Sequence, residues 1–244
     1  MTSLACWSAL NALPHRGQGL DRHAYKIYIM GGPIFDLIDA IANGDFLRAA
    51  ATIGAMAVLL FICFPVHEYA HAWAANKLGD DTAEKLGRLS INPFVHLDLV
   101  GSLLLLAFGF GWAKPVPVNT YRLNGNPKVA FALVALAGPV SNILLAIGFG
   151  FIYQAVKAYD IILLEYLCII AVQINLFLAF FNLIPVPPLD GSRILAAVLP
   201  DSMSDILRQI ERYGFLILIL AMNTGIFSGL VATPARAIAR LLLS

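Results

Sequence analysis

Residues 49–73 read AAATIGAMAVLLFICFPVHEYAHAW. The first 18 of them, Ala49 to Val66, carry no charge, and two histidines and a glutamate follow directly. A helix needs about 20 apolar residues to cross the hydrocarbon of a bilayer, so this run predicts a membrane span that ends in ionisable side chains. Ionisable groups at membrane depth are costly and by default indicate function. The stretch therefore predicts a membrane protein and locates its chemistry.

The composition of the whole chain agrees with a membrane protein. Of its 244 residues, 59% are hydrophobic and 13% are charged, whereas soluble domains are about 45–50% apolar and about 25% charged. A soluble fold could not cover its surface with so few charged side chains. The net charge of +1 gives no reason to expect nucleic acid as a partner. The three cysteines are scattered, which excludes a disulfide framework.

Further charge-free runs cover residues 99–113, 129–156, 166–189 and 213–235. Three of these four runs are long enough to span as helices, as is the first run. The run over 99–113 has only 15 residues and includes three glycines. We expect it to be a re-entrant or interfacial segment whose backbone is satisfied by protein or water.

The first 48 residues contain no candidate span and no continuous apolar segment typical of a signal peptide. Met30 opens a plausible start, so one hypothesis is that translation begins there and that the first 29 residues are not native. N-terminal sequencing would decide between Met1 and Met30. We expect residues 1–48 to be an N-terminal extension and residues 49–244 to form a single membrane-embedded domain with its core over 49–200.

The ionisable side chains after the first run form the pattern H-E-x-x-H, from His67 to His71. Residues four apart share one face of a helix, so both imidazoles can bind one Zn²⁺ while Glu68 faces water at the metal. Such zinc lowers the pKa of its water to about 7, and the carboxylate can pass the proton to a leaving amine. Chance is a poor explanation, because the chain has only five His and four Glu, and three of these nine fall within five residues. The pattern predicts the arrangement of a metalloprotease.

Zinc requires a third protein ligand, and spacing alone leaves several candidates open. They are the remaining glutamates, one histidine and two aspartates: Glu84, Glu165, Glu211, His96, Asp98 and Asp190. Asp190 is favoured because prolines at 185, 187 and 188 break the preceding run, and proline interrupts a helix. An unwound segment can turn an acid back toward the interior of a helix bundle. The alternative makes Asp190 the N-cap of a helix over 192–199.

Three blocks of sequence carry a family resemblance. They are His67-Glu68-x-x-His71, Ala137-Gly138-Pro139-x-x-Asn142, and Phe181-Asn182-Leu183-Ile184-Pro185 with Leu189-Asp190-Gly191-Ser192-Arg193. In this order they resemble the site-2 protease family of intramembrane zinc metalloproteases, over about residues 47–200. The chain is also similar to the compact subgroup without PDZ or CBS domains, through Gly87-Arg88-Leu89-x-x-Asn92-Pro93, His96-Leu97-Asp98 and the segment from Gly111 to Asn119.

The resemblance implies roles for five residues. His67, His71 and Asp190 would bind one Zn²⁺ per chain, Glu68 would be the general base and acid, and Asn182 would help to hold the oxyanion. It also implies that residues 87–119 pair with an unwound substrate strand. Three more polar residues receive no role: His96, Asp98 and Asn142. Packing of small residues near the zinc helix is the simplest interpretation of the block that contains Asn142.

We therefore expect an all-α polytopic membrane protein with about 4–6 transmembrane helices and a re-entrant or short β segment near the active site. The expected function is hydrolysis of peptide bonds in or near transmembrane segments, so the expected partners are the lipid bilayer and a membrane-protein substrate with a transmembrane helix. Two alternatives stay open. One is a membrane zincin of another family with glutamate as its third ligand, and the other is a non-proteolytic metal-binding membrane protein or transporter.

The distribution of Lys and Arg predicts an orientation. If 99–113 re-enters, residues 67–128 and 190–212 share one side of the membrane and hold nine Lys and Arg. The other side holds four near the spans and three more in residues 16–26. Because cytoplasmic loops are enriched in Lys and Arg, we expect a multi-pass protein of a prokaryotic plasma membrane with its active site toward the cytoplasmic side.

Overall fold

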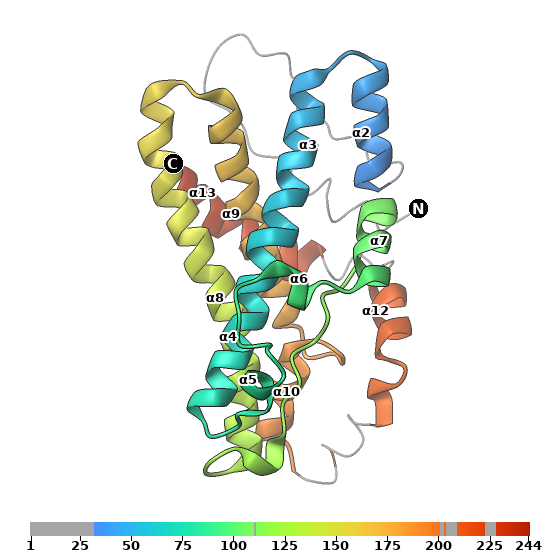
Figure 1. Ribbon diagram of the computed structural model, residues 1–244, viewed down its shortest axis with the longest axis vertical. Coiled ribbons are helices and arrows are strands. Elements are labelled where there is room, and N and C mark those ends of the chain that lie inside the picture. Colours follow the sequence, from blue (N-terminus) through green and yellow to red (C-terminus); the bar gives the residue numbers. More distant parts are fainter. Residues whose placement is uncertain (1–31, 110, 201–202, 204–208, 223–227) are drawn as a thin grey trace.

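A computed structural model describes residues 32–109, 111–200, 203, 209–222 and 228–244 (Figure 1). Within these ranges the chain forms helices and loops, and its only β pairing is an isolated antiparallel bridge between Leu97 and Ala113. The predicted all-α class is confirmed, and this isolated bridge is what the described residues show of the expected re-entrant or short β segment. Both candidate starts, Met1 and Met30, lie outside the described residues.

Three helices in the described part are long and apolar enough to cross a membrane. The first, Phe46–Lys77, consists of α3 (Phe46–Val58), a π-turn η1 (Leu59–Cys63) and α4 (Phe64–Lys77). The second joins α8 (Pro127–Val156) to the short η3 (Lys157–Tyr159), and the third is α9 (Ile162–Asn182). They correspond to three of the predicted spans.

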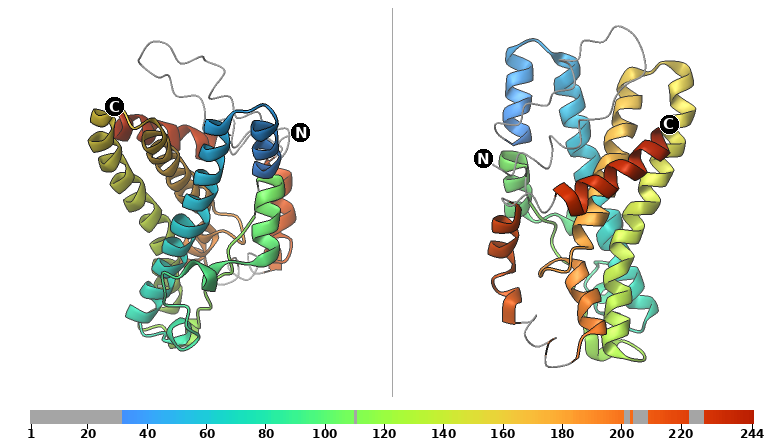
Figure 2. Two further views of the ribbon diagram at one scale, coloured as in Figure 1. Left: turned by 45° about the horizontal axis from the view of Figure 1, so that its top comes forward. Right: turned by 180° about the vertical axis from the view of Figure 1, so that it is seen from behind.

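The remaining predicted span, over 213–235, is described only in pieces. These are α12 (Gly214–Met222), a π-turn η4 (Ser228–Ala232) and α13 (Thr233–Leu243), and residues 223–227 between them lie outside the described part. Figure 2 shows α13 running obliquely across α8 and α9, on which it packs. The described pieces therefore leave the prediction of one continuous helix untested.

The π-turn lies where the first helix meets its proline. Pro65 has no N–H, and its ring crowds the carbonyl four residues earlier, so a regular α-helix cannot continue unchanged through this point. The chain widens to a π-turn over Leu59–Cys63 and resumes α-helical geometry in α4. Such turns inside α-helices are frequent at functional sites. Here the turn directly precedes the H-E-x-x-H pattern.

The centre of the bundle is the packing of α8 on α4 and α9. Asn126 caps α8 by accepting from the Lys128 N–H at 3.0 Å, and Pro127 follows at the first helical position. The third helix ends at Asn182, before the prolines, and residues 183–189 are unwound. The next helix, α10 (Asp190–Val198), then packs on α8. This return brings Asp190 back to the bundle.

Shorter helices stand to one side of the three long ones. In Figures 1 and 2, α2 (Pro33–Ala42), α7 (Leu99–Phe108) and α12 form this side column. The buried Asp36 of α2 pairs with Arg48 and accepts from the Thr52 hydroxyl of α3 at 2.8 Å. The ten residues of α7 rise about 15 Å, roughly half of the hydrocarbon thickness. As predicted, this run is too short to span as a helix.

Three one-turn helices complete the part that connects α4 to α8. They are α5 (Thr82–Lys85), α6 (Pro93–His96) and η2 (Thr120–Arg122). Of these, α5 packs on α4, α6 packs on α4 and on the π-turn η1, and η2 packs on α8 (Figure 1).

Candidate metal centre and its pocket

Two imidazoles and a carboxylate converge inside the bundle. His67 and His71 lie one turn apart on α4, and Asp190 is the first residue of α10. The two Nε2 atoms are 3.0 Å apart, and each lies 3.3 Å from Oδ2 of Asp190. Both histidines are buried. Among the described residues, these three form the one cluster of His, Cys, Asp and Glu that could hold a metal.

The other nitrogen of each imidazole is held from behind by α8. His71 Nδ1 lies 2.8 Å from the carbonyl oxygen of Val134, and His67 Nδ1 lies 2.5 Å from Oδ1 of Asn142. A carbonyl oxygen only accepts hydrogen bonds, so each Nδ1 carries a proton, and in the neutral imidazole that binds a metal each Nε2 then presents a lone pair. Three lone pairs thus face one another at the front of the site.

This arrangement fits zinc. Asp190 Oδ2 is buried and accepts no hydrogen bond from any described residue, which is costly unless a cation compensates it. Zinc binds imidazole nitrogen and carboxylate oxygen at about 2.0–2.2 Å in tetrahedral geometry, which separates its ligand atoms by about 3.3 Å. The observed separations of 3.0–3.3 Å agree with that geometry. Three protein ligands also leave one position open, as in catalytic zinc sites.

Asp190 does not act as the N-cap that was the alternative interpretation. The cap position of α10 is Leu189, and no side chain caps the helix. The helix covers Asp190–Val198 rather than 192–199, because Asp190 itself already has helical geometry. Its carboxylate is therefore directed to the imidazoles and not to the helix N-terminus.

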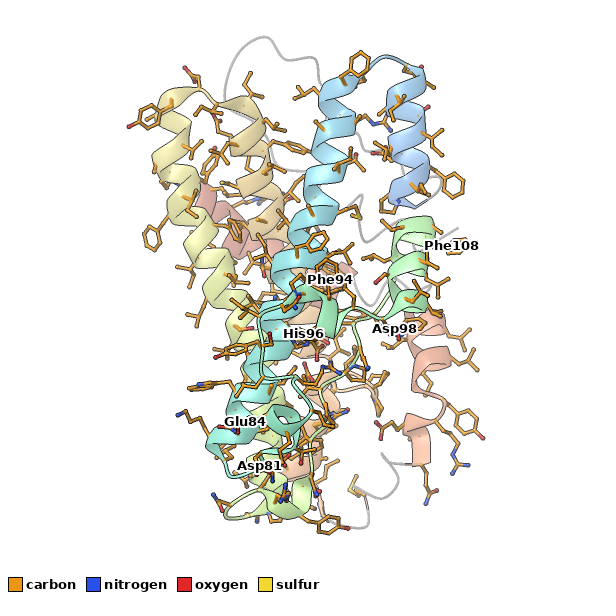
Figure 3. All side chains as sticks on the ribbon, in the orientation of Figure 1. Asp81, Glu84, Phe94, His96, Asp98 and Phe108 are labelled. Atoms are coloured by element: carbon orange, nitrogen blue, oxygen red, sulfur yellow. The ribbon has the colours of Figure 1, made fainter. Side chains whose placement is uncertain are left out.

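The remaining candidate ligands lie outside the cluster. Glu84 accepts from the Asn76 amide at 2.7 Å, Asp98 caps α7 by accepting from the Gly101 N–H at 2.8 Å, and Glu165 lies in the first turn of α9. Glu211 is exposed. Figure 3 shows Glu84 on α5, His96 at the end of α6 and Asp98 directly before α7. None of the three other glutamates joins the two histidines.

Gly138 of α8 explains how the two imidazoles can lie so close to that helix. A Cβ at this position would lie 2.4 Å from His71 Nε2 and 2.6 Å from His67 Cε1. Such distances are far below van der Waals contact, so only glycine fits. The predicted packing of small residues near the zinc helix is observed, and it makes room for the two candidate ligands.

The cluster opens into a cavity of about 340 Å³ that contains the other predicted site residues. Glu68 lines this cavity, and its Oε2 accepts from the Val116 N–H at 3.1 Å. Asn182 lines it as well, and its amide donates to the Leu178 carbonyl at 3.0 Å, within its own helix. Among the described residues, this amide forms no hydrogen bond to another helix.

The loop side of the cavity is held by two buried basic residues. Arg88 is 6% exposed and donates to the Lys114 carbonyl at 2.5 Å. His96 is fully buried, its Nε2 lies 2.6 Å from the Ser90 carbonyl, and its own carbonyl accepts from the Lys114 N–H at 2.7 Å. Burial lowers the pKa of both side chains, and the Glu68 carboxylate acts in the opposite direction. These contacts fix residues 113–116 against Glu68.

Two of these supports were not recognised from the sequence. Asn142 received no role, and Arg88 appeared only inside a family block. A signal was present for Asn142, because Val134, Gly138 and Asn142 are spaced four apart and therefore share one face of α8. The sequence does not show that this face meets α4.

Comparison with known proteins identifies the family. Residues 151–222 match the model of peptidase family M50, a range that includes Asn182 and Asp190. YwhC of Bacillus subtilis is 44% identical over 69% of this chain and 80% of its own length. Rip2 of Mycolicibacterium smegmatis is 30% identical over 79% of this chain and 80% of its own length. MJ0611 of Methanocaldococcus jannaschii is 33% identical over 54% of this chain and 64% of its own length.

All three relatives carry the words zinc metalloprotease in their names, and all three are prokaryotic. No solved structure is a significant match. The identity to YwhC and Rip2, over four fifths of each, agrees with the metal cluster and with the three spanning helices. The chain belongs to peptidase family M50, the site-2 protease family, and is a zinc-dependent membrane protease.

Proposed function

We propose that this protein is an intramembrane protease that hydrolyses peptide bonds in or near the transmembrane segments of other membrane proteins. The single observation that carries the proposal is the convergence of His67, His71 and Asp190 within a spanning bundle, beside a cavity that also contains Glu68. Zinc, when bound, supplies Lewis-acid chemistry that acidifies water and polarises a peptide carbonyl.

The protein's own residues would perform the proton transfers. Glu68 faces the cavity, so its carboxylate can take a proton from the attacking water and deliver it to the leaving amine. Asn182 lies on the same cavity, and its amide nitrogen carries two hydrogens, of which the Leu178 carbonyl uses one. The second hydrogen can stabilise the negative charge on the substrate carbonyl oxygen.

The depth of the site supports cleavage close to one membrane boundary. His67 lies roughly 30 Å along the first spanning helix from Phe46, which is about the thickness of the hydrocarbon. The same end of the molecule carries the basic loops between α4 and α8. We infer that this end faces the cytoplasm, so that water reaches the cavity without crossing the bilayer.

Residues 113–118 would receive the substrate as an extended strand. The N–H groups of Lys114 and Val116 are already bound to the His96 carbonyl and to Glu68, and Pro115 and Pro117 have none. This segment would therefore pair with a substrate strand mainly through its own carbonyl groups. A helical substrate must unwind first, because a helix uses its own peptide groups.

The test compares cells that carry the wild-type protein with cells that carry Glu68→Gln. We expect Glu68→Gln to retain one zinc per chain while a membrane protein accumulates uncleaved, because the amide cannot accept the proton. Glu84→Gln, on the exposed side of α5, is the matched control and should behave as wild type. The N-terminus of the released fragment locates the cleaved bond. Unchanged cleavage in Glu68→Gln, or a bond far from any transmembrane segment, would overturn the proposal.

A further inference from the structure

Behind the metal cluster lies a chain of buried hydrogen bonds that the proposed mechanism does not use. Asn142 Nδ2 of α8 donates to Oδ1 of Asn175 at 2.8 Å. Asn175 Nδ2 donates to the Ala171 carbonyl at 2.8 Å and lies 3.2 Å from Cys63 Sγ on the π-turn. Both asparagines are fully buried. These hydrogen bonds thus connect α9, α8 and the π-turn to His67.

One backbone carbonyl determines the direction of each hydrogen bond in this series. The Ala171 oxygen only accepts, so the Asn175 amide must point its nitrogen there and its oxygen toward Asn142. Asn142 must then donate through its nitrogen, which leaves its oxygen for His67 Nδ1, 2.5 Å away. An amide oxygen cannot donate, so the proton of His67 resides on Nδ1.

We propose that Asn142 is the positioning residue for His67, and that the Asn175 relay fixes it in the orientation that leaves His67 Nε2 free to bind zinc. The inference rests on the proposed function, in which His67 is a ligand. Partners of this kind set the tautomer and ring orientation of metal-binding histidines, and their loss typically costs 10–100-fold in metal affinity.

The two histidines differ in how this control is supplied. His71 Nδ1 is held by the Val134 carbonyl, a backbone group that no side-chain substitution removes. His67 depends on a side chain in a bilayer-spanning helix, where no bulk water can replace a lost acceptor. Substitution of Asn142 should therefore weaken zinc binding, whereas substitution of Val134 leaves the backbone acceptor of His71 in place.

The experiment measures the zinc Kd of purified full-length protein in detergent, by competition with a chromogenic chelator, and the melting temperature of the zinc-free protein. Asn142→Leu keeps the side-chain size and removes both hydrogen bonds; we expect the zinc Kd to rise about 10–100-fold. Asn142→Asp keeps an acceptor toward His67 and should retain a Kd within about threefold of wild type, since carboxylates also support metal-bound histidines.

Two variants of α9 separate the relay from general effects of burial. Asn175→Leu leaves the His67 contact possible but frees Asn142 to turn, so its Kd should rise less than that of Asn142→Leu. Gln173→Leu removes a buried amide of the same helix outside this chain of hydrogen bonds and should leave the Kd unchanged. If Asn142→Leu does not fold, Asn175→Leu decides, because a Kd equal to that of Gln173→Leu overturns the inference.

The outcomes distinguish this inference from the proposed function. Wild-type protein that binds no zinc, or His67→Ala protein that binds it normally, would overturn the proposed ligand set and the inference with it. Normal zinc binding by the wild type together with an unchanged Kd in Asn142→Leu would overturn the positioning role alone. A lower melting temperature without a change in Kd would show that Asn142 only packs the bundle.

Discussion

The cavity beside the metal cluster has two sides that are built in different ways. The helical wall consists of α4 with its supports on α8 and α10, and its candidate ligands are fixed by buried side chains and backbone carbonyls. The loop wall consists of residues 111–118, which hold their place through a few hydrogen bonds to Arg88, His96 and Glu68. One wall is packed helix on helix, and the other is a single extended segment.

This difference indicates that the two walls have different roles. A metal site tolerates little movement, because its ligands must stay within a few tenths of an ångström of their positions. A substrate-binding edge must instead accept peptides of different sequence through backbone hydrogen bonds. We therefore expect changes in the helical wall to remove zinc, and changes in the loop wall to weaken substrate binding while zinc remains.

The largest effect should follow from Gly138→Ala. Its Cβ would lie 2.4 Å from His71 Nε2, so the imidazoles or α8 must move. Because alanine is a better helix former than glycine by about 1 kcal/mol, the helix itself is not weakened. We expect zinc content, measured by elemental analysis, to fall below one tenth of the wild-type value, with cleavage lost in parallel.

Gly148→Ala is the matched control for this change. It lies on the same helix, and a Cβ there meets nothing within 4 Å among the described residues. It should retain full zinc content. A wild-type zinc content in Gly138→Ala would mean that the imidazoles can shift apart without loss of zinc, which would remove the contrast between the two walls.

A smaller effect is expected from Arg88→Met in the loop wall. The change leaves the Lys114 carbonyl without its charged donor, and hydrogen bonds to charged groups contribute about 1.5–3 kcal/mol. We expect the KM for the membrane protein that accumulates in Glu68→Gln cells to rise about tenfold or more, as that energy implies. The zinc content should remain one per chain.

The control for Arg88→Met is Arg122→Met, which removes an exposed arginine bound to Asp81 at the far end of the loop. It should alter neither KM nor zinc content. Loss of zinc in Arg88→Met would contradict the comparison, because it would show that the loop wall also supports the ligands.

Much of the helical wall could be predicted from the sequence, because its signals are local. Charge-free runs located the three long helices, and the four-residue spacing of His67 and His71 placed both on one helix face. The prolines before Asp190 indicated an unwound return, although the run to Leu189 extends past the observed end of α9 at Asn182. In each case a short stretch of sequence is enough to determine the local structure.

The contacts between elements could not be predicted in the same way. Asn142 and His67 are 75 residues apart, and Arg88 and Lys114 are 26 apart. Helical periodicity shows which residues share a face but does not show which helix that face meets. From sequence alone, a buried asparagine that is bonded to a candidate metal ligand cannot be distinguished from one that only packs a bundle.

The smallest predicted effect concerns Asp98, which lies next to the bridge between Leu97 and Ala113 in the loop region. Its carboxylate caps α7 through the Gly101 N–H at 2.8 Å, and loss of such a cap typically costs about 1 kcal/mol. Asp98→Ala should therefore lower the unfolding free energy in detergent titrations by about that amount, with zinc content unchanged and KM raised less than in Arg88→Met. Asp98→Asn keeps an acceptor and should restore the stability. If Asp98→Ala instead removed zinc as Gly138→Ala is expected to do, the carboxylate would have to serve the metal site, and the two walls would not be independent.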